Sequence, residues 1–306
     1  MAYFPAKHWD SGADKWDKTT ENPNFPHYFY YYEADLYIDD VVKTAKIALE
    51  LGSGSCGSTI RHVSASTRIV AVDYSPSMLK IGKQKLLAAE QSDNVDLICS
   101  DICNLPLRSE VFDAVFSRGL ALSYASDPKR LAQEARRVLK GQGSLGIDFM
   151  NGAHAKKTRP EFCRFEPIGD ALYYVEQFVE DGKQKRTGYR LPKDFKPPQP
   201  LEGSVFGGFR AKPDWLNLDG VEKEEWWAVF YTPAEARRLF RSAGFKRVRL
   251  FPLGCFTYGQ RNKDLANFLK DNRDIISKLQ KDLAKVFRMD RAVHIFLTAS
   301  KPESLS

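Results

Sequence analysis

Between residues 46 and 149 the chain alternates short apolar runs with longer segments whose apolar positions recur every three or four residues. Short apolar runs predict buried strands, and the three-to-four-residue period predicts amphipathic helices. Their alternation predicts an α/β fold in which helices cover both faces of a parallel sheet. Two more apolar runs follow near the C-terminus, so the predicted strands are residues 46–51, 68–73, 94–100, 111–117, 144–149, 245–253 and 291–300.

Capping residues mark the ends of the helices between these strands. Ser75, followed by a proline, is a good N-cap for a helix over residues 75–90. Asp127 is placed to cap a helix that runs through Lys140, and Gly141 and Gly143 follow as its terminators. An amphipathic helix is also expected from Tyr28 to Lys43, ahead of the first strand.

Two helices are predicted in the C-terminal part of the chain. Thr232 and Glu235 form a capping box for a helix that ends at Ala243. Residues 264–288 carry apolar side chains at helical spacing with lysines opposite, and we interpret this stripe as core packing rather than membrane docking. The apolar members of the stripe are Leu265, Phe268, Leu269, Ile275, Ile276, Leu279, Leu283 and Val286.

Residues 150–230 interrupt this pattern with a long segment of strand-like character. A hairpin is predicted over residues 171–191, because an Asp-Gly turn at 181–182 separates two runs rich in β-formers. Residues 193–213 are rich in Pro and Gly and are expected to form a mobile loop, and residues 222–231 can add another strand. The insertion follows the fifth strand, so we expect it to form a lid over an acceptor site. Its aromatic residues, either a lining for that site or the core of the lid itself, are Tyr173, Tyr174, Tyr189, Trp215, Trp226 and Trp227.

A glycine-rich segment, ELGSGSCG, follows the first predicted strand. Gly52, Gly54 and Gly57 permit a tight turn and bring the backbone of the next helix close to a ligand. This spacing alone fits a nicotinamide dinucleotide as well as other nucleoside ligands.

Two acidic residues narrow the choice of ligand. Glu50 stands two residues before the first glycine, where its carboxylate would face the mouth of the loop and repel a pyrophosphate. S-adenosylmethionine is a cation without phosphate, so a carboxylate there favours it. Asp73 ends the second strand and can accept hydrogen bonds from ribose hydroxyls in either cofactor class.

Four segments in order, ELGSGSCG, VAVDYSPSMLKIGKQK, ICSDICNLPLRSEVFDAVFS and LAQEARRVLKGQGSLGIDF, resemble the class I S-adenosylmethionine-dependent methyltransferases. Within them the chain looks like the small-molecule, ubiquinone/menaquinone-methyltransferase-like branch. The resemblance covers residues 46–149 and implies a doubly wound, seven-stranded, mostly parallel Rossmann-like sheet with a reversed terminal hairpin. It also implies S-adenosylmethionine as the cofactor.

The resemblance carries over a set of cofactor-binding positions. Asp101 stands where the family accepts the adenine amino group, and Ile102 where a residue packs on the ring. Ser117, Arg118 and Gly119 lie at the carboxyl end of the fourth strand, where the methionine end of the cofactor would lie. The full predicted set is Glu50, Gly52, Ser53, Gly54, Gly57, Asp73, Tyr74, Met78, Asp101, Ile102, Ser117 and Arg118.

The family's segment ahead of the glycine loop implies a third part of the site. Residues 1–45 are expected to form an aromatic cap over the pocket, with His27, Tyr28 and Tyr32 as possible contacts or as ordinary packing. The core would comprise residues 46–149 and 231–306, and the lid residues 150–230.

Methyl transfer from a sulfonium mainly requires alignment, and a general base only for a nucleophile of high pKa. The candidate bases are Asp148, at the end of the fifth strand, and His154 and His27. Turn stabilisation is an equal alternative role for Asp148.

Composition excludes several function classes. Five cysteines (Cys56, Cys99, Cys103, Cys163, Cys255) lack paired metal spacing, so no metal site is expected. No run of apolar residues is long enough to span a membrane and no signal peptide is evident, so the chain is expected to be cytoplasmic. The net charge of +7 is concentrated beyond Thr232, where 16 Lys and Arg face 7 Asp and Glu, and a solvated face explains this better than nucleic-acid binding.

The sequence therefore predicts a cytoplasmic methyltransferase that acts on an O, N or C nucleophile of a small molecule. The alternative is an RNA or protein methyltransferase that uses the basic C-terminal region. A non-catalytic cofactor-binding protein is less consistent with the intact acids Glu50, Asp73 and Asp101. An aminopropyltransferase is disfavoured because the sequence shows no acidic polyamine-binding motif. The acceptor and the oligomeric state do not follow from the sequence.

Overall fold

The structure of the protein is a computed structural model of all 306 residues. It describes residues 6–20, 28–153, 163–168, 171–180, 183–190, 205–208, 227–254, 268 and 271–303. All statements below concern these residues.

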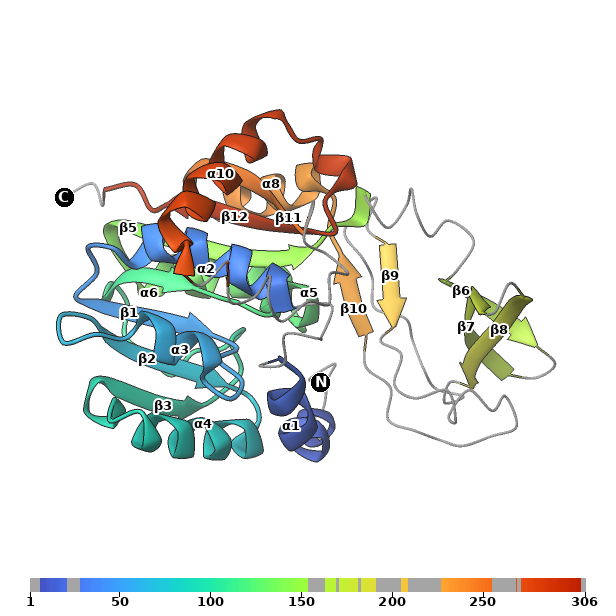
Figure 1. The fold of residues 1–306 in the computed structure, drawn as a ribbon, viewed down its shortest axis with the longest axis horizontal. Helices are drawn as coiled ribbons and strands as arrows, with labels where there is room; N and C mark the ends of the chain where they lie inside the picture. The colour runs from blue at the N-terminus through green and yellow to red at the C-terminus, as the bar shows by residue number, and fades with distance from the viewer. Residues whose placement is uncertain are drawn as a thin grey trace.

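Seven strands form one sheet in the order β11-β12-β5-β4-β1-β2-β3 (Figure 1). Neighbouring strands from β5 to β3 pair in parallel, whereas β12 runs antiparallel to both β5 and β11. The reversed strand and the central parallel strands confirm the predicted fold class. The strands are β1 (Ile47–Leu51), β2 (Arg68–Asp73), β3 (Val95–Cys99), β4 (Phe112–Phe116), β5 (Leu139–Met150), β11 (Lys246–Leu253) and β12 (His294–Ser300).

Helices cover both faces of this sheet. The helices that the structure describes are α1 (Ala6–Thr20), α2 (Tyr28–Val42), α3 (Gly57–His62), α4 (Pro76–Ala88), α5 (Ala121–Tyr124), α6 (Pro128–Val138), α8 (Pro233–Ser242) and α10 (Arg273–Val286), with short 3-10 turns η1 (Ser92–Asn94) and η3 (Met289–Arg291). The predicted caps are confirmed: the side chains of Ser75 and Asp127 accept backbone hydrogen bonds, and Thr232 and Glu235 form a reciprocal capping box.

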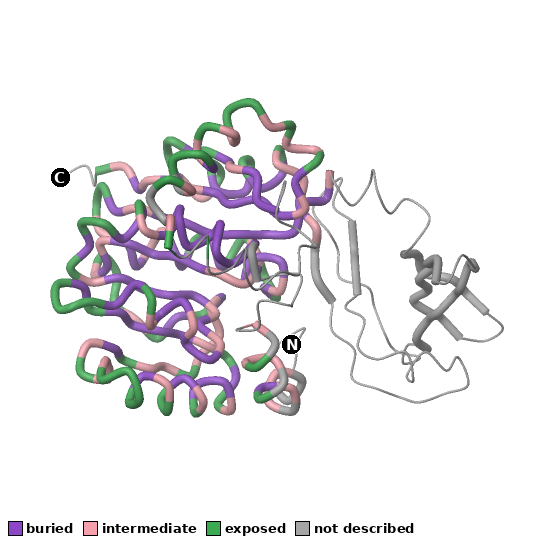
Figure 2. The backbone as a smooth tube through the Cα atoms, viewed as in Figure 1, coloured by how far each residue is buried: buried purple, intermediate pink, exposed green. Residues whose placement is uncertain are grey.

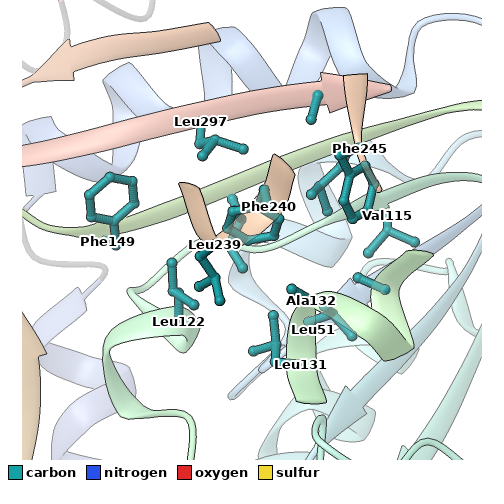
Figure 3. Packing of buried hydrophobic residues seen from close by; sticks show 14 of the residues in the cluster. Leu51, Val115, Leu122, Leu131, Ala132, Phe149, Leu239, Phe240, Phe245 and Leu297 are labelled. Atoms are coloured by element: carbon teal, nitrogen blue, oxygen red, sulfur yellow. The ribbon is translucent and has the colours of Figure 1, made fainter. Parts of the chain in front are cut away.

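The two faces of the sheet bury separate hydrophobic cores. Along β1, Leu49 and Leu51 point into the core beneath α6 and α8, while Ala48 points into the core beneath α2 and α3. Figure 2 shows the central strands as an almost continuous buried layer between exposed helix faces. Figure 3 shows the first core, where Phe240 and Leu239 of α8 meet Leu131 of α6 and Leu297 of β12. Burial on both faces explains why the central strands are continuous apolar runs.

Parallel pairing brings the carboxyl ends of β1, β2 and β4 together. Leu51 pairs with Val72, and Glu50 pairs with both Ala71 and Phe116. The segments that follow these strands therefore meet at one edge of the sheet. In Figure 1, α1 lies beside α4 at this edge.

Two predicted boundaries were wrong. Helix α6 ends at Val138, and β5 starts at once at Leu139, so Lys140, Gly141 and Gly143 belong to the strand rather than to the helix and its terminator. Lys140 extends from the strand to pair with Asp113 at 2.7 Å. Long-range pairing of β5 with β4 and β12 outweighs the local glycine signal.

The inserted segment contains short antiparallel ladders. The predicted hairpin is present as β7 (Ala171–Glu180) and β8 (Lys183–Arg190), and β6 (Cys163–Ile168) adds a strand beside it that the sequence did not indicate. A strand was expected within 222–231, and β10 (Trp227–Phe230) is found there. It pairs with β9 (Val205–Gly208), so part of the expected loop 193–213 is a strand. The division into cap, core and lid stays a prediction.

None of the helices in the described ranges has the length and apolar character needed to cross a membrane.

Candidate functional site

A cavity opens at the carboxyl edge of the sheet, where the segments after β1, β2, β3 and β4 meet α1. It contains about 1100 Å³ of space free of protein atoms, open solvent included. The residues that line it are Trp9, Trp16, Thr20, Tyr31, Gly52, Ser53, Gly54, Ser55, Gly57, Asp73, Tyr74, Met78, Asp101, Ile102, Arg118, Gly119, Ala121, Tyr124, Ala125 and Ser126. Ten of the twelve predicted cofactor-binding residues are among them, whereas Glu50 and Ser117 are not.

The glycine loop forms one wall of this cavity. Gly52 and Gly54 have φ angles of +70° and +53°, which residues other than glycine rarely adopt. A Cβ on Gly52 would also lie 3.1 Å from the Cβ of Ala121. The backbone amides of Gly52 and Ser53 both donate to the carbonyl of Val72, at 2.8 and 3.0 Å. The loop is thus held against β2 while its tip stays open to a ligand.

Asp73 links the end of β2 to the glycine loop. Its Oδ2 accepts from the amide of Gly54 at 2.8 Å, and its Oδ1 accepts from the amide of Ser75 at 2.9 Å. Burial raises the pKa of Asp73, and these hydrogen bonds partly oppose the shift. A carboxylate has about four acceptor positions, so roughly two remain for a ligand that enters the cavity.

The loop after β3 brings Asp101 and Ile102 to the same cavity. One carboxylate oxygen of Asp101 accepts from the amide of Cys103 at 2.8 Å, which fixes the side chain in a turn. Tyr74, which is exposed, and Met78, which is buried, lie between this loop and the glycine loop. The arrangement provides an acidic group next to an apolar surface, as a purine ring requires.

Helix α1 closes the cavity from the opposite side. The Asp17 Oδ1 atom accepts a 2.5 Å hydrogen bond from the Ser55 hydroxyl and pairs with Lys85 at 2.8 Å. At the other end of the helix, Asp10 accepts from the Ser75 hydroxyl at 2.5 Å. Both carboxylates thus attach α1 to the elements that form the site.

Aromatic side chains line the inner face of α1. The ring of Trp9 lies edge to face with Trp16, at 5.6 Å between centroids, and with Tyr124 of α5, at 5.4 Å. Both tryptophans belong to the aromatic N-terminal segment, but the sequence interpretation did not identify them as lining residues. Their seven-residue separation on a helix places both on one side, and that spacing could have identified them.

Arg118 supplies the cationic group of the cavity. Its guanidinium lies 5.0 Å from the centroid of the Tyr31 ring and 3.1 Å from Asp35, which also pairs with Arg61 at 2.7 Å. Asp35 is fully buried, so the two arginines balance its charge. Tyr31 therefore contacts the site, whereas Tyr32, the predicted contact, is buried and does not line the cavity.

Glu50 lies beneath the glycine loop and not at its mouth. It is 1% exposed and accepts a 2.5 Å hydrogen bond from the Thr59 hydroxyl of α3. Burial raises its pKa to about 7, against the opposing effects of Thr59 and Arg118. The expected orientation of this carboxylate was wrong, because β1 is buried on both faces and directs Glu50 inward. Its role in cofactor binding stays a prediction.

Asp148 is enclosed by hydrogen-bond donors. The Tyr30 hydroxyl and the amide of Gly119 donate to its Oδ2, and the amide of Leu120 donates to its Oδ1. The side chain is fully buried and does not line the cavity. This geometry favours the turn-stabilising role over that of a base. Residues His27 and His154 lie outside the described residues, as do the side chains of Tyr28 and of the lid aromatics.

Residues 120–126 were missed by the sequence interpretation, although Ala121, Tyr124, Ala125 and Ser126 line the cavity. Gly119 has a φ of +105° and Leu120 a φ of +72°, and this bent segment leads into α5. No motif marks these positions, because their place depends on the buried Asp148.

The site has polar groups that are suited to a ligand. Ser53 lines the cavity, and its buried hydroxyl has no hydrogen-bond partner among the described residues. Cationic Arg118, the acids Asp73 and Asp101, and aromatic walls surround the same space. Within the described ranges no group of three or more His, Cys, Asp or Glu residues could hold a metal ion. These features fit a nucleoside with a zwitterionic amino-acid end.

Comparisons with known proteins agree with this geometry. Residues 49–147 match the family model described as a methyltransferase domain. A demethylmenaquinone methyltransferase of Bacillus cereus (strain ATCC 10987 / NRS 248) is 26% identical over 250 residues, which cover 81% of this chain and 88% of that protein.

Solved structures share the fold. A methyltransferase of Thermotoga maritima, described as a possible histamine N-methyltransferase, aligns with a TM-score of 0.52 at 13% identity, over 96% of this chain and 97% of its own. The 1,6-didemethyltoxoflavin-N1-methyltransferase of Burkholderia thailandensis aligns with a TM-score of 0.51 at 14% identity, over 97% and 87%.

Proposed function

We propose that this chain, a class I S-adenosylmethionine-dependent methyltransferase of the small-molecule type, methylates an O, N or C nucleophile on an aromatic or quinol-like ring. The predicted family resemblance, enzyme class and cofactor are confirmed. The nucleophile, the ring and the residue roles below are proposals. They are supported chiefly by one observation, the cavity in which the glycine loop, Asp73, Asp101 and Arg118 meet beneath α1.

The cavity residues divide into groups that suit the parts of the cofactor. Asp73 would accept from the ribose hydroxyls with its remaining acceptor positions, and Asp101 from the adenine amino group, with Ile102 against the ring. Arg118 would pair with the carboxylate of the amino-acid end. When bound, the cofactor supplies an electrophilic sulfonium methyl group.

The protein's contribution to the reaction is alignment and exclusion of water. Helix α1 attaches through Asp10 and Asp17 and covers the cavity, which restricts both the cofactor and the acceptor. None of the three candidate bases is required by this arrangement. Asp148 lies behind the Gly119–Leu120 turn, where it holds the backbone that lines the cavity.

The ring-shaped acceptor is proposed from the walls of the cavity and from the relatives. Trp9, Trp16, Tyr31 and Tyr124 line the side of the cavity nearest α1 and α5, and flat apolar rings pack well against such side chains. The Bacillus cereus relative is named for a quinone substrate. RNA or protein as the acceptor is not favoured.

Calorimetry with S-adenosylmethionine tests the assignment of Asp73. An Asp73→Asn substitution is expected to weaken binding about tenfold or more, because charge-assisted hydrogen bonds to the ribose are lost. The matched control is Asp96→Asn on the adjacent strand, where the carboxylate pairs with exposed Arg68. Equal affinities for the Asp73 variant and the control would overturn the assignment.

An assay with methyl-labelled cofactor tests the acceptor class. A soluble demethylated naphthoquinol is expected to be methylated, with lower kcat/KM in a Tyr124→Ala variant that still binds the cofactor. Transfer to bulk RNA or to protein, with no transfer to any ring compound, would contradict the proposal.

A further inference from the structure

Helix α10 presents apolar side chains to solvent. Ile275, Leu279 and Val286 are 68%, 47% and 78% exposed, and their spacing of four and seven residues places them on one side of the helix. Phe268, seven residues before Ile275, is also exposed. The sequence interpretation assigned these four residues to core packing, and that prediction was wrong.

The opposite side of α10 explains its orientation. Gln280 is 2% exposed and donates to the carboxylate of Glu33 at 3.1 Å and to the carbonyl of Pro252 at 3.2 Å. A polar side chain thus anchors the helix to α2 and β11, while the apolar stripe is directed outward. Surface helices of globular proteins usually show the reverse.

Cations border the apolar stripe. Lys278 and Lys285 are exposed on α10. Lys285 also lines a groove, together with Lys281 of α10 and residues of β11 and α8. The groove adds Arg237, Arg247 and Arg249, all exposed. Among the described residues here, the acids next to these six cations are Asp40, paired with Lys281, and Asp282, paired with Lys285.

We propose that the α10 face, defined as Ile275, Leu279 and Val286 with the six bordering cations, docks on the surface of an anionic phospholipid bilayer. An apolar stripe flanked by lysines is the pattern of helices that lie in the membrane interface. Phosphate headgroups complement the groove cations, and acyl chains accept the stripe.

The charge pattern argues against other occupants. A second copy related by twofold symmetry would bring the same cations together, which is unfavourable. Single-stranded RNA would use the cations, but Ile275, Leu279 and Val286 have no aromatic ring, and Phe268 is the one aromatic side chain among the four exposed stripe residues on which a base could stack. The proposal does not depend on the acceptor.

Vesicle co-sedimentation of the full chain tests this docking. Binding is expected on phosphatidylcholine vesicles that contain phosphatidylglycerol, with little binding to phosphatidylcholine alone and a decrease as salt rises. The double variant Ile275→Ser/Leu279→Ser is expected to reduce partitioning about tenfold or more. The double variant Lys278→Glu/Arg249→Glu should reduce partitioning onto the vesicles about fivefold for each cation that is replaced.

Matched controls lie on α4. Leu87 is 56% exposed and Lys83 is exposed, so Leu87→Ser and Lys83→Glu alter similar groups elsewhere. Both controls are expected to retain binding, and circular dichroism should show all variants folded.

Equal binding to neutral and anionic vesicles would overturn the proposal, and so would an equal loss of binding in the α4 controls. The proposal would also fail if the chain did not bind vesicles and instead bound RNA or dimerised in a way that the α10 variants abolish. Affinity for S-adenosylmethionine, measured in the same variants, is expected to stay unchanged, so failure here leaves the proposed function intact.

Discussion

The Asp17 carboxylate of α1 accepts a 2.5 Å hydrogen bond from the Ser55 hydroxyl of the glycine loop. The same oxygen lies 2.8 Å from the Nζ atom of Lys85 on α4. One side chain therefore joins three elements that surround the cavity, although 38 residues separate it from Ser55 along the chain.

Substitution of Asp17 should weaken cofactor binding. Asp17→Asn retains the size of the side chain but loses its charge, so we expect the dissociation constant for S-adenosylmethionine to rise roughly tenfold. Titration calorimetry measures this. Asp14→Asn, an exposed position on the same helix, is the control. If both variants bind as tightly as the unmodified chain, α1 does not hold the site closed.

Glu50 should make stability depend on pH. Its pKa is about 7 in the folded chain, against 4.5 as the ordinary value, because of burial. Between these values the folded state holds a proton that the unfolded state has released, so the free energy of unfolding falls as pH rises.

Once the pH exceeds 7, the ionisation of Glu50 has lowered the free energy of unfolding by about 3 kcal/mol. Denaturant unfolding from pH 4.5 to 8 should therefore show a smaller fall in the Glu50→Gln variant, whose side chain does not ionise. Parallel stability curves for the two proteins would show that Glu50 does not titrate in this range.

Gly82 of α4 leaves room for the glycine loop. A Cβ at this position would lie 2.4 Å from the Sγ of Cys56 and 3.1 Å from its Cβ. Gly82→Ala is therefore expected to destabilise the fold by about 1–3 kcal/mol and to weaken cofactor binding by displacing the loop.

Adding Cys56→Ala to Gly82→Ala should recover part of the stability that Gly82→Ala loses, because the 2.4 Å contact with the Sγ of Cys56 disappears. Gly12→Ala in α1, where no atom lies within 4 Å of the added Cβ, is instead expected to stabilise by about 0.5–1 kcal/mol. Thermal unfolding of the three variants and of the unmodified chain measures these differences. A neutral Gly82→Ala would mean that α4 shifts freely against the loop.

Asp148 should behave as a positioning residue. An Asp148→Asn amide offers one acceptor oxygen where the carboxylate offers two, so one donor in the Gly119–Leu120 turn loses its partner. We expect a loss of about 1–3 kcal/mol in stability and lower kcat/KM. Tyr30→Phe removes a donor from the same carboxylate and should have similar effects.

The pH–rate profile separates this role from that of a general base. In the unmodified chain and in both variants, the acidic limb of kcat/KM should keep its midpoint. A limb that disappears in Asp148→Asn but persists in Tyr30→Phe would identify Asp148 as the base.

Residues close in sequence to a strand end were placed well by pattern alone. Gly52 and Gly54 follow β1, Asp73 ends β2 and Asp101 lies just after β3, and parallel pairing brings all such positions to one edge. Caps such as Ser75 and Thr232 are similarly local.

The direction and the burial of individual side chains were harder to predict from the sequence pattern. Trp16 faces the cavity because Asp10 and Asp17 attach α1 to distant hydroxyls, and α10 turns its apolar stripe outward because Gln280 bonds to Glu33. Neither contact leaves a periodic signal in the sequence, since each joins residues more than 30 positions apart.

By itself the sequence determined the seven strands of the main sheet, the glycine turn and the acids at the strand ends, because these depend on local propensity and on residue spacing. Only the tertiary structure decided that Glu50 lies under the loop, that Asp148 braces a turn and that α10 exposes Ile275, Leu279 and Val286. The physical reason is that burial and hydrogen bonding are set by neighbours from other elements, which the chain brings together only when it folds.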